Sequence, residues 1–464
     1  MFANVVACST KSEFVVDAGR HTDAHPHADA GVSPDGATST PDAATDAATS
    51  TPDANVSAPD ASVAKSDLEL LNELVAALPT ATNDTARRKL VSAFTTAVTY
   101  GERGFPIREG GMLAFALYDT DGGSFTVAGD FNGWDAAAWP LSQPVAGFPF
   151  YYRIQPVSEP LPRTLYKFVH NGADWFADPI ARRRGWDGYG PYSLAEAGDA
   201  QSHIERWPDF AQGVGALQPR NVDIYVPAAY QKGTATLPVL YMHDGQNLFD
   251  PEGLWGSWQV GTTADEKIGS GAAAPVLIVG VWNTSDRMDE YTQVADDIGG
   301  GTLVGGRANE YADFLVKGVK PFVDARYRTK ADRASTAVLG SSLGGIVSFY
   351  AAWRYPDIFG HSGSMSGTFG WGSWGTSSNM TLMHMFMAMP PSGVVFYLDS
   401  GGDAGAGCPN GGGDNYCETV DMADALRGLG WKDGVDLLYA WAPGAQHNEA
   451  EWAARFPALL ADWY

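Results

Sequence analysis

From about residue 221 to residue 441 the chain alternates short apolar runs with longer stretches of helical periodicity. The apolar runs read VDIYVP, LPVLYMHDG, APVLIVGVW, STAVLGSS, VVFYLDSG and VDLLYAW, and the helical stretches include ANEYADFLVKGVKPFVDARY and GGIVSFYAAWRYP. Strands that alternate with helices in this way form a mostly parallel sheet with helices on both faces. Ligands of such sheets bind at the carboxyl ends of the strands. The pattern therefore predicts an α/β domain over 201–464 with a functional site at that edge.

The stretch VLGSSLGG carries two adjacent serines between the strand STAVL and a helical stretch. A nucleophilic serine on a strand-to-helix turn needs small residues two positions before it and two positions after it, because the backbone there is crowded. Around Ser342 those positions are Gly340 and Gly344, whereas around Ser341 both are leucines. The spacing therefore selects Ser342 as the candidate nucleophile.

A catalytic serine needs a base to accept its proton and an acid to orient that base, and in this type of fold the chain order is serine, acid, histidine. Among the later histidines, only His447 in APGAQHNEAEW comes late enough to reach the carboxyl edge of the sheet. The strand end LDSG and the loop after it hold four candidate acids: Asp399 in the strand itself, then Asp403, Asp414 and Glu418. Asp414 is favoured because it lies just before a helical stretch, and Asp403 and Asp399 remain alternatives.

An oxyanion hole needs two backbone amides, one from the residue after the nucleophile and one from the loop after an early strand. Leu343 supplies the first amide. Gln246 in HDGQNLFDP is the natural second donor, because Gly245 before it allows close approach. Asp244 and Asp250 in the same loop have no cluster of His or Cys beside them, so we expect neither a metal nor another cofactor.

Four stretches, LYMHDGQNLFDP, VGVWNTSDRMDEYT, VLGSSLGG and PGAQHNEAEW, together resemble the "Putative esterase" family. This family groups enterochelin and other trilactone esterases, feruloyl and acetyl-xylan esterases of the first carbohydrate esterase family, and mycolyltransferases. The resemblance implies an α/β-hydrolase fold and cleavage of carboxylic esters through an acyl-enzyme. It implies Ser342 as nucleophile, His447 as base, and Gln246 and Leu343 as oxyanion donors. The acid is expected in the loop after LDSG, which is longer here than in simpler relatives.

Four tryptophans that follow strand ends are candidate substrate-binding residues: Trp258, Trp282, Trp371 and Trp374. Indole rings at such positions can flank an aromatic acyl group or a sugar ring, or they can fill a core. The expected substrates are feruloyl- or acetyl-type esters of plant polysaccharide. Siderophore trilactones of the enterochelin type are the alternative substrate, and a catalytically silent glycan-binding or scaffold protein is the alternative from another class.

Over 105–200 the signals change to short strands separated by Gly, Asn and Pro, the pattern of a small immunoglobulin-like β-sandwich. Within it, VAGDFNGWD resembles the early-set, glycogen-branching-enzyme type of carbohydrate-binding module, and YKFVHNGADWFADP fits the closing strands of that family. The resemblance implies one of two roles for this module. It binds glycan through Trp134, Trp139 or Trp175, or it packs on the enzyme without binding sugar.

A helical pair is expected over 66–104. SDLELLNELVAALP combines Ser66 as a helix cap with apolar residues at helical spacing and Pro79 as a stop. A second helix should run from about residue 84 to residue 100. The preceding residues, 1–65, are expected to hold an export signal and a disordered spacer, because most of this stretch consists of Ala, Thr, Ser, Pro and Asp and has little to bury.

Charge and hydropathy limit the partners. The chain has 54 acidic and 30 basic residues, and its net charge of −24 repels nucleic acids and anionic membrane surfaces. No apolar run reaches 18 residues, so no membrane span is predicted. The partner expected is therefore a small or polysaccharide-linked ester, bound by a monomer.

The three cysteines bear on the compartment. VVAC, which ends at Cys8, resembles a bacterial lipobox, and because only seven residues precede that cysteine, the start of the signal peptide is expected to lie upstream. Cys408 and Cys417 lie close together in a Gly-rich loop and are expected to form a disulfide, with reduced cytosolic thiols as the alternative. We therefore expect a bacterial protein outside the cytoplasm, secreted or lipid-anchored at the outer membrane or cell surface.

Overall fold

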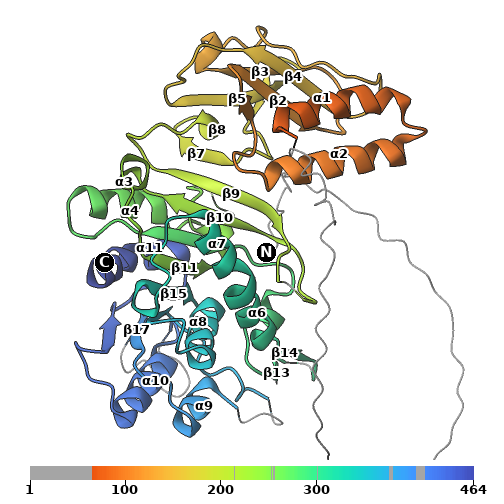
Figure 1. Cartoon of the computed structure of the whole chain (residues 1–464). Helices are drawn as coiled ribbons and strands as arrows, with labels where there is room; N and C mark the ends of the chain where they lie inside the picture. The colour runs from red at the N-terminus through yellow and green to blue at the C-terminus, as the bar shows by residue number, and fades with distance from the viewer. Residues whose placement is uncertain are drawn as a thin grey trace, which may run out of the picture. The chain divides into compact units, whose positions relative to one another are not determined.

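The computed structural model describes residues 65–464 except 214, 252, 254–255, 300, 376–379 and 404–412, and Figure 1 colours it from the N-terminal part in red to the C-terminus in blue. From Ser66 to Tyr464 the described residues belong to one unit. The expectations for Cys8 and the spacer fall outside the described residues. Among the described helices, none is long and apolar enough to cross a membrane.

Two helices open the described chain, as the sequence predicts. Helix α1 (Asp67–Ala77) begins with a capping box in which Ser66 Oγ accepts the Glu69 amide and the Glu69 carboxylate accepts the Ser66 amide. A short turn containing a proline ends it. Helix α2 (Asp84–Thr99) is capped by the Asn83 side chain. Apolar side chains of both helices pack together against the strands that follow.

The next region is an antiparallel β-sandwich. One sheet contains β1 (Ile107–Glu109), β2 (Met112–Tyr118) and β4 (Phe150–Pro156). The facing strands are β3 (Phe125–Gly129), β5 (Thr164–His170), β6 (Asp174–Phe176), β7 (Arg183–Asp187) and β8 (Gly190–Glu196). Buried rings of Phe115, Phe125 and Tyr166 fill the space between the two sheets. Short strands predicted over 105–200 are thus confirmed.

The second of these sheets continues into the C-terminal half of the chain. Strand β9 (His203–Phe210) pairs antiparallel with β7 on one side and with β10 (Arg220–Val226) on the other. The result is one 13-stranded sheet in the order β18-β17-β16-β15-β11-β12-β10-β9-β7-β8-β5-β3, with β6 beside β5. Backbone hydrogen bonds therefore join the β-sandwich to the C-terminal half of the chain. No side-chain pattern in the sequence indicates this connection.

The C-terminal half of the chain contains the predicted parallel strands. They are β11 (Val239–His243), β12 (Leu277–Val281), β15 (Thr336–Ser341), β16 (His361–Met365), β17 (Val395–Ser400) and β18 (Leu437–Trp441). All neighbouring pairs among them are parallel, whereas β10 is antiparallel to β12. A small hairpin, β13 (Ala295–Asp297) and β14 (Leu303–Gly305), stands apart. The α/β fold class is confirmed.

Helices cover both faces of this sheet (Figure 1), because successive side chains of each strand point to opposite faces. On one face lie α6 (Ala308–Phe314), α7 (Lys320–Arg326), α8 (Leu343–Arg354), α9 (Leu382–Ala388) and α10 (Tyr416–Leu429). On the other lie α4 (Val260–Gly269) and α11 (Glu449–Trp463). Two short helices, α3 (Ala228–Lys232) and α5 (Arg287–Glu290), follow strand ends.

Candidate active site

Ser342 lies at the turn between β15, which ends at Ser341, and α8, which begins at Leu343. Its φ of 56° and ψ of −123° fall in a region that non-glycine residues rarely occupy. There is no room for a side chain at Gly340, where a Cβ would come within 2.5 Å of the Gly344 carbonyl group. A strained serine beside a crowded glycine is the geometry of a nucleophile elbow. Ser342 thus has the predicted position, and Ser341 is buried in the strand.

His447 and Asp414 form the second part of the site. His447, in the loop between β18 and α11, has its Nδ1 2.8 Å from Oδ1 of Asp414, which lies just before α10. The carboxylate is fully buried and the imidazole is 37% exposed, so the histidine is open to a substrate. Asp403 is exposed in the same loop, and Asp399 is buried in β17, where it accepts the Tyr397 hydroxyl. Among the predicted acids, Asp414 is the one that contacts the histidine.

The nearest polar neighbour of the Ser342 hydroxyl is a residue that the sequence did not indicate. Ser342 Oγ is 3.4 Å from Oγ1 of Thr368, which follows β16, and Asn415 Nδ2 donates to the same threonine at 3.3 Å. Within the described part of the chain, no hydrogen bond joins Ser342 to His447. Catalytic hydrogen bonds are often loose without substrate.

Three groups hold the Asp414 carboxylate on the side away from the histidine. Ser366 Oγ donates to Oδ2 at 2.7 Å, and the Gly401 amide donates to the same oxygen. Nη1 and Nη2 of Arg455 each lie 3.4 Å from it. These residues come from the ends of β16 and β17 and from α11. No motif or spacing links them, so the sequence analysis missed them.

Burial changes the ionisation of two other carboxyl groups near this pair. It raises the pKa of Asp399 to about 6, although Arg455 acts in the opposite direction. Burial also raises the pKa of Glu418 on α10, whose Oε2 accepts the Gly370 amide at 2.9 Å. The site therefore contains carboxyl groups that take up protons more readily than exposed ones.

Gln246 and Leu343 occupy the two predicted oxyanion positions. Gln246 lies in the turn directly after β11, and Leu343 opens α8. Neither of these amides donates a hydrogen bond to another described residue, so both are free to bind a substrate oxygen. A Cβ on Gly245 would come within 2.6 Å of the Gly280 carbonyl group. The glycine before Gln246 is thus required by close approach, as predicted.

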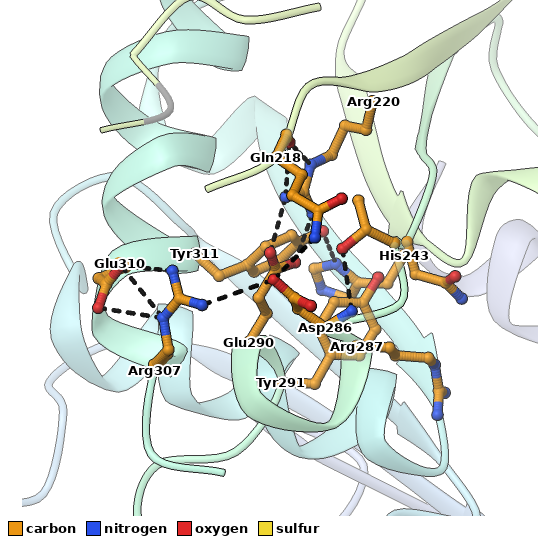
Figure 2. A network of polar contacts seen from close by, with 12 residues as sticks. Gln218, Arg220, His243, Asp286, Arg287, Glu290, Tyr291, Arg307, Glu310 and Tyr311 are labelled. Atoms are coloured by element: carbon orange, nitrogen blue, oxygen red, sulfur yellow. Dashed lines mark hydrogen bonds and ion pairs between the residues drawn. The ribbon is translucent and has the colours of Figure 1, made fainter. Parts of the chain in front are cut away.

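A polar network lies behind this oxyanion loop, and Figure 2 shows His243, Arg287 and Tyr311 in it. Asp244 has a φ of 56°, and its carboxylate accepts hydrogen bonds from Arg287 at 2.7 and 2.8 Å and from Asn283 at 2.6 Å. His243 Nδ1 lies 2.9 Å from the Tyr311 hydroxyl. Burial lowers the pKa of His243 to about 4, so this imidazole is neutral. The network holds Asp244, which lies two residues before Gln246.

Two of the four predicted substrate-binding tryptophans are core residues. Trp258 is 3% exposed, and its ring centroid lies 5.8 Å from that of Trp452 and 6.3 Å from that of Phe456. Trp371 is 1% exposed and donates its indole N–H to the Val294 carbonyl at 2.8 Å. Each indole is enclosed by protein, because the large apolar rings fill space between elements. The structure therefore corrects the prediction for both residues.

The other two tryptophans reach solvent. Trp282 is half-buried, donates its indole N–H to Asp223 at 2.9 Å, and lies under the Arg206 guanidinium, 4.6 Å from the ring centroid. Trp374 is 49% exposed, on the loop after β16. Buried Asp296 accepts three backbone amides of that loop, at 2.6, 3.0 and 2.7 Å. Trp374 is thus an exposed indole on a firmly held loop.

Of the three cysteines, Cys417 lies among the described residues. Cys417 is disulfide-bonded, and Cys408 lies outside the described residues. The described part of the chain contains no group of three or more His, Cys, Asp or Glu side chains that could hold a metal ion.

In hydrolases of the α/β class, the nucleophilic serine occupies a strand-turn-helix elbow, and the acid and the histidine follow it in the chain. The fold and the site of this protein define it as a member of that class. Within the class, the chain belongs to the family described as "Putative esterase", whose sequence model matches residues 216–463, more than half of the chain. This membership indicates a carboxylic ester hydrolase.

Two curated proteins are similar in sequence. The uncharacterized protein YbbA of Bacillus subtilis is 26% identical over 251 residues, which cover 53% of this chain and 92% of that protein. An endo-1,4-beta-xylanase/feruloyl esterase of Xylanibacter ruminicola is 27% identical over 177 residues, which cover 36% of this chain. The chain spans only 22% of the length of that second relative.

The solved structures to which this chain is similar include two esterases. The enterobactin esterase of Shigella flexneri is 16% identical, covers 76% of this chain and 93% of its own, and has a TM-score of 0.42. A ferulic acid esterase from Anaeromyces mucronatus is 18% identical, covers 56% of this chain and 89% of its own, and has a TM-score of 0.41.

Proposed function

We propose that the protein is a serine esterase that cleaves carboxylic esters through an acyl-enzyme. The contact between His447 Nδ1 and Asp414 carries this proposal, because a histidine whose Nδ1–H donates to a carboxylate has Nε2 left to accept the proton of a serine. Membership of an esterase family supports the same chemistry.

The reaction follows from the positions of these groups. Ser342 Oγ attacks the ester carbonyl carbon while His447 Nε2 takes the hydroxyl proton, and the amides of Leu343 and Gln246 donate to the oxygen that becomes negative. Asp414 stabilises the imidazolium. The C–O bond to the alcohol then breaks, and the alcohol leaves with the proton from the imidazolium. Water, deprotonated by the same histidine, hydrolyses the acyl-enzyme and restores the serine.

Feruloyl- or acetyl-type esters of plant polysaccharide are the proposed substrates. The exposed indole of Trp374 offers a flat surface to an aromatic acyl group or a sugar ring. The Xylanibacter relative, whose name includes feruloyl esterase, supports this substrate class. For an anionic siderophore trilactone the site is less suited, because Arg287 and Arg455 are both engaged by buried carboxylates.

For the β-sandwich module we propose glycan binding through Trp134 and Trp175. Their ring centroids lie 6.3 Å apart, and Trp175 is 42% exposed, so the two indoles offer adjacent apolar faces to a sugar chain. Trp139 stacks on Phe131 at 4.3 Å and serves packing instead. Binding of xylo-oligosaccharides that disappears in Trp175→Ala would support this role, and unchanged binding would contradict it.

We also propose that the protein is monomeric and acts outside the cytoplasm, secreted or anchored by a lipid on Cys8. The disulfide at Cys417 supports this location, because disulfides persist in oxidising compartments. Mass spectrometry of the membrane fraction, with and without Cys8→Ala, tests the anchor.

A panel of feruloyl, acetyl-xylan and enterochelin-type trilactone esters tests the enzymatic function. We expect the wild type to hydrolyse the first or second class, Ser342→Ala to lose about 10⁶-fold in kcat, and Ser341→Ala to stay near wild type. Preference for the trilactone would overturn the substrate assignment alone. Lack of labelling of Ser342 by a fluorophosphonate probe would overturn the enzyme class and favour a silent glycan-binding or scaffold protein.

A further inference from the structure

Arg455 on α11 reaches three parts of the chain at once. Its side chain is only 9% exposed. Nε lies 3.2 Å from Oδ2 of Asp399 in β17, and Nη2 donates to Oγ of Ser366 after β16 at 2.8 Å. Nη1 and Nη2 both lie 3.4 Å from Oδ2 of Asp414. A single planar guanidinium thus connects the ends of two strands with the acid that contacts His447.

Two buried carboxyl groups share one cation around Arg455. Asp399 and Asp414 both have fully buried carboxyl groups, and Arg455 is the cation that contacts both. A buried carboxylate without a partner cation is strongly destabilised. The raised pKa of Asp399, caused first by burial and also by the charge of Asp414, is consistent with one cation shared between two acids.

Ser366 connects the Arg455 guanidinium with Asp414 and with Trp452, and both of these contact His447. Ser366 has a φ of 52° and is fully buried. Its Oγ donates to Asp414 at 2.7 Å and accepts from Arg455 at 2.8 Å and from the Trp452 indole at 2.9 Å. The Trp452 ring in turn meets the His447 ring edge-on, with centroids 5.0 Å apart. Acid and base are therefore both held from α11.

We propose that Arg455 is a positioning residue for the triad: it fixes Asp414 and Ser366 so that the carboxylate faces His447. This inference rests on the proposed esterase function. Arg455 lies behind the acid and touches no reacting atom, so it acts on the rate through Asp414 and His447 and leaves substrate binding unaffected.

Two substitutions separate the shape of Arg455 from its charge. Arg455→Lys keeps the charge but lacks the planar fork that reaches three partners, and Arg455→Met loses both. For Arg455→Lys we expect kcat on a p-nitrophenyl ester to fall about tenfold and for Arg455→Met about 10²-fold, because small displacements of catalytic groups are costly. KM should stay unchanged in both.

The pH profile provides a readout that a purely structural role would not change. Charged or titratable groups near His447 and Arg455 come from β17, α10 and its preceding loop, and α11: Tyr397, Asp399, Asp414, Glu418 and Glu449. Without the cation, the four carboxylates among these groups stabilise the imidazolium more strongly. The acidic limb of kcat/KM should therefore move to higher pH in Arg455→Met and stay in place in Arg455→Lys.

The double variant Arg455→Met/Asp399→Asn decides between positioning and charge balance, and it also serves if Arg455→Met alone fails to fold. It removes one buried acid together with the cation, so its Tm should recover toward wild type while kcat remains low. Recovery of wild-type kcat in the double variant would overturn the proposal, as would wild-type kcat and pH profile in both single variants.

Labelling of Ser342 by a fluorophosphonate distinguishes failure of this inference from failure of the proposed substrate. The probe reports activation of the serine and needs no particular ester. Slower labelling in Arg455→Lys and Arg455→Met supports the positioning role whichever ester is the substrate. Wild-type labelling rates in both folded variants would overturn that role even if the enzyme hydrolyses feruloyl esters.

Discussion

Asp414 Oδ1 lies 2.8 Å from His447 Nδ1, although 33 positions separate the two residues. With Nδ1–H donating to the carboxylate, the tautomer of the imidazole is set, and Nε2 is left as an acceptor. Because the carboxylate is buried and the histidine is partly open, the pair combines a shielded acid with an accessible base.

Asp414→Asn should lower kcat by about 10³–10⁴-fold, because the amide favours the wrong tautomer of the histidine. Asp403→Asn in the same loop is the matched control, since that carboxylate is exposed and has no contact with His447. Steady-state kinetics on an activated ester measure both. Equal losses in the two variants, or a larger loss in Asp403→Asn, would contradict the assignment of the acid.

Gly340→Ala should destabilise the fold by about 1–3 kcal/mol and reduce activity, since the new Cβ collides with the Gly344 backbone and forces the elbow open. Gly428→Ala in α10 is the control. A Cβ at Gly428 meets nothing within 4 Å, and alanine favours a helix interior by roughly 0.5–1 kcal/mol. Urea unfolding measures the stability of both variants. A stable, fully active Gly340→Ala enzyme would show that the elbow has room for a methyl group at this position.

Tyr100→Ala should cost about 2–4 kcal/mol of stability. Tyr100 ends α2, yet its ring packs on Trp207 and Phe322, with centroids 5.9 and 6.4 Å away, and its hydroxyl donates to the Pro208 carbonyl at 2.8 Å. Tyr189→Ala, at a ring that is 90% exposed, should be neutral. Thermal unfolding distinguishes them. If Tyr100→Ala matched Tyr189→Ala, the N-terminal helices would be dispensable for the catalytic half.

His243 should make the protein less stable as the pH falls from about 6.5 to about 4. Burial lowers its pKa from 6.5 to about 4 in the folded state. Between those values the unfolded chain binds the proton and the folded chain does not, so stability is lost on acidification, by up to about 3 kcal/mol. His243→Gln lacks this titration. Urea unfolding at pH 7 and pH 4.5 should show a smaller loss for the variant, and an equal loss would contradict the buried neutral imidazole.

Much of the fold was predictable because it depends on short-range rules. The capping box at Ser66 and the apolar spacing after it located α1, and the alternation of strands and helices identified the α/β class. The antiparallel link from β7 through β9 to β10 was not predictable, since it consists of backbone hydrogen bonds between strands whose side chains carry no sign of direction or partner.

The tryptophans show the same limit within the site. Trp258 and Trp374 both follow strand ends in the sequence, but the first is 3% exposed and the second 49%. A large aromatic ring suits a core as well as a binding surface. The neighbouring elements make the difference between the two tryptophans. Helix α11 packs on Trp258, whereas the loop of Trp374 is held by Asp296 and leaves its indole exposed.

By itself the sequence determined which serine and which histidine are the candidate nucleophile and base. Glycine spacing selects Ser342 because the elbow is a local backbone constraint, and chain order selects His447. The sequence favoured Asp414 but left Asp403 and Asp399 open, and the tertiary structure decided which of these carboxylates contacts that histidine. Asp414 owes its place to a serine, a backbone amide and Arg455, which come from separate elements and converge only when the sheet and α11 pack together.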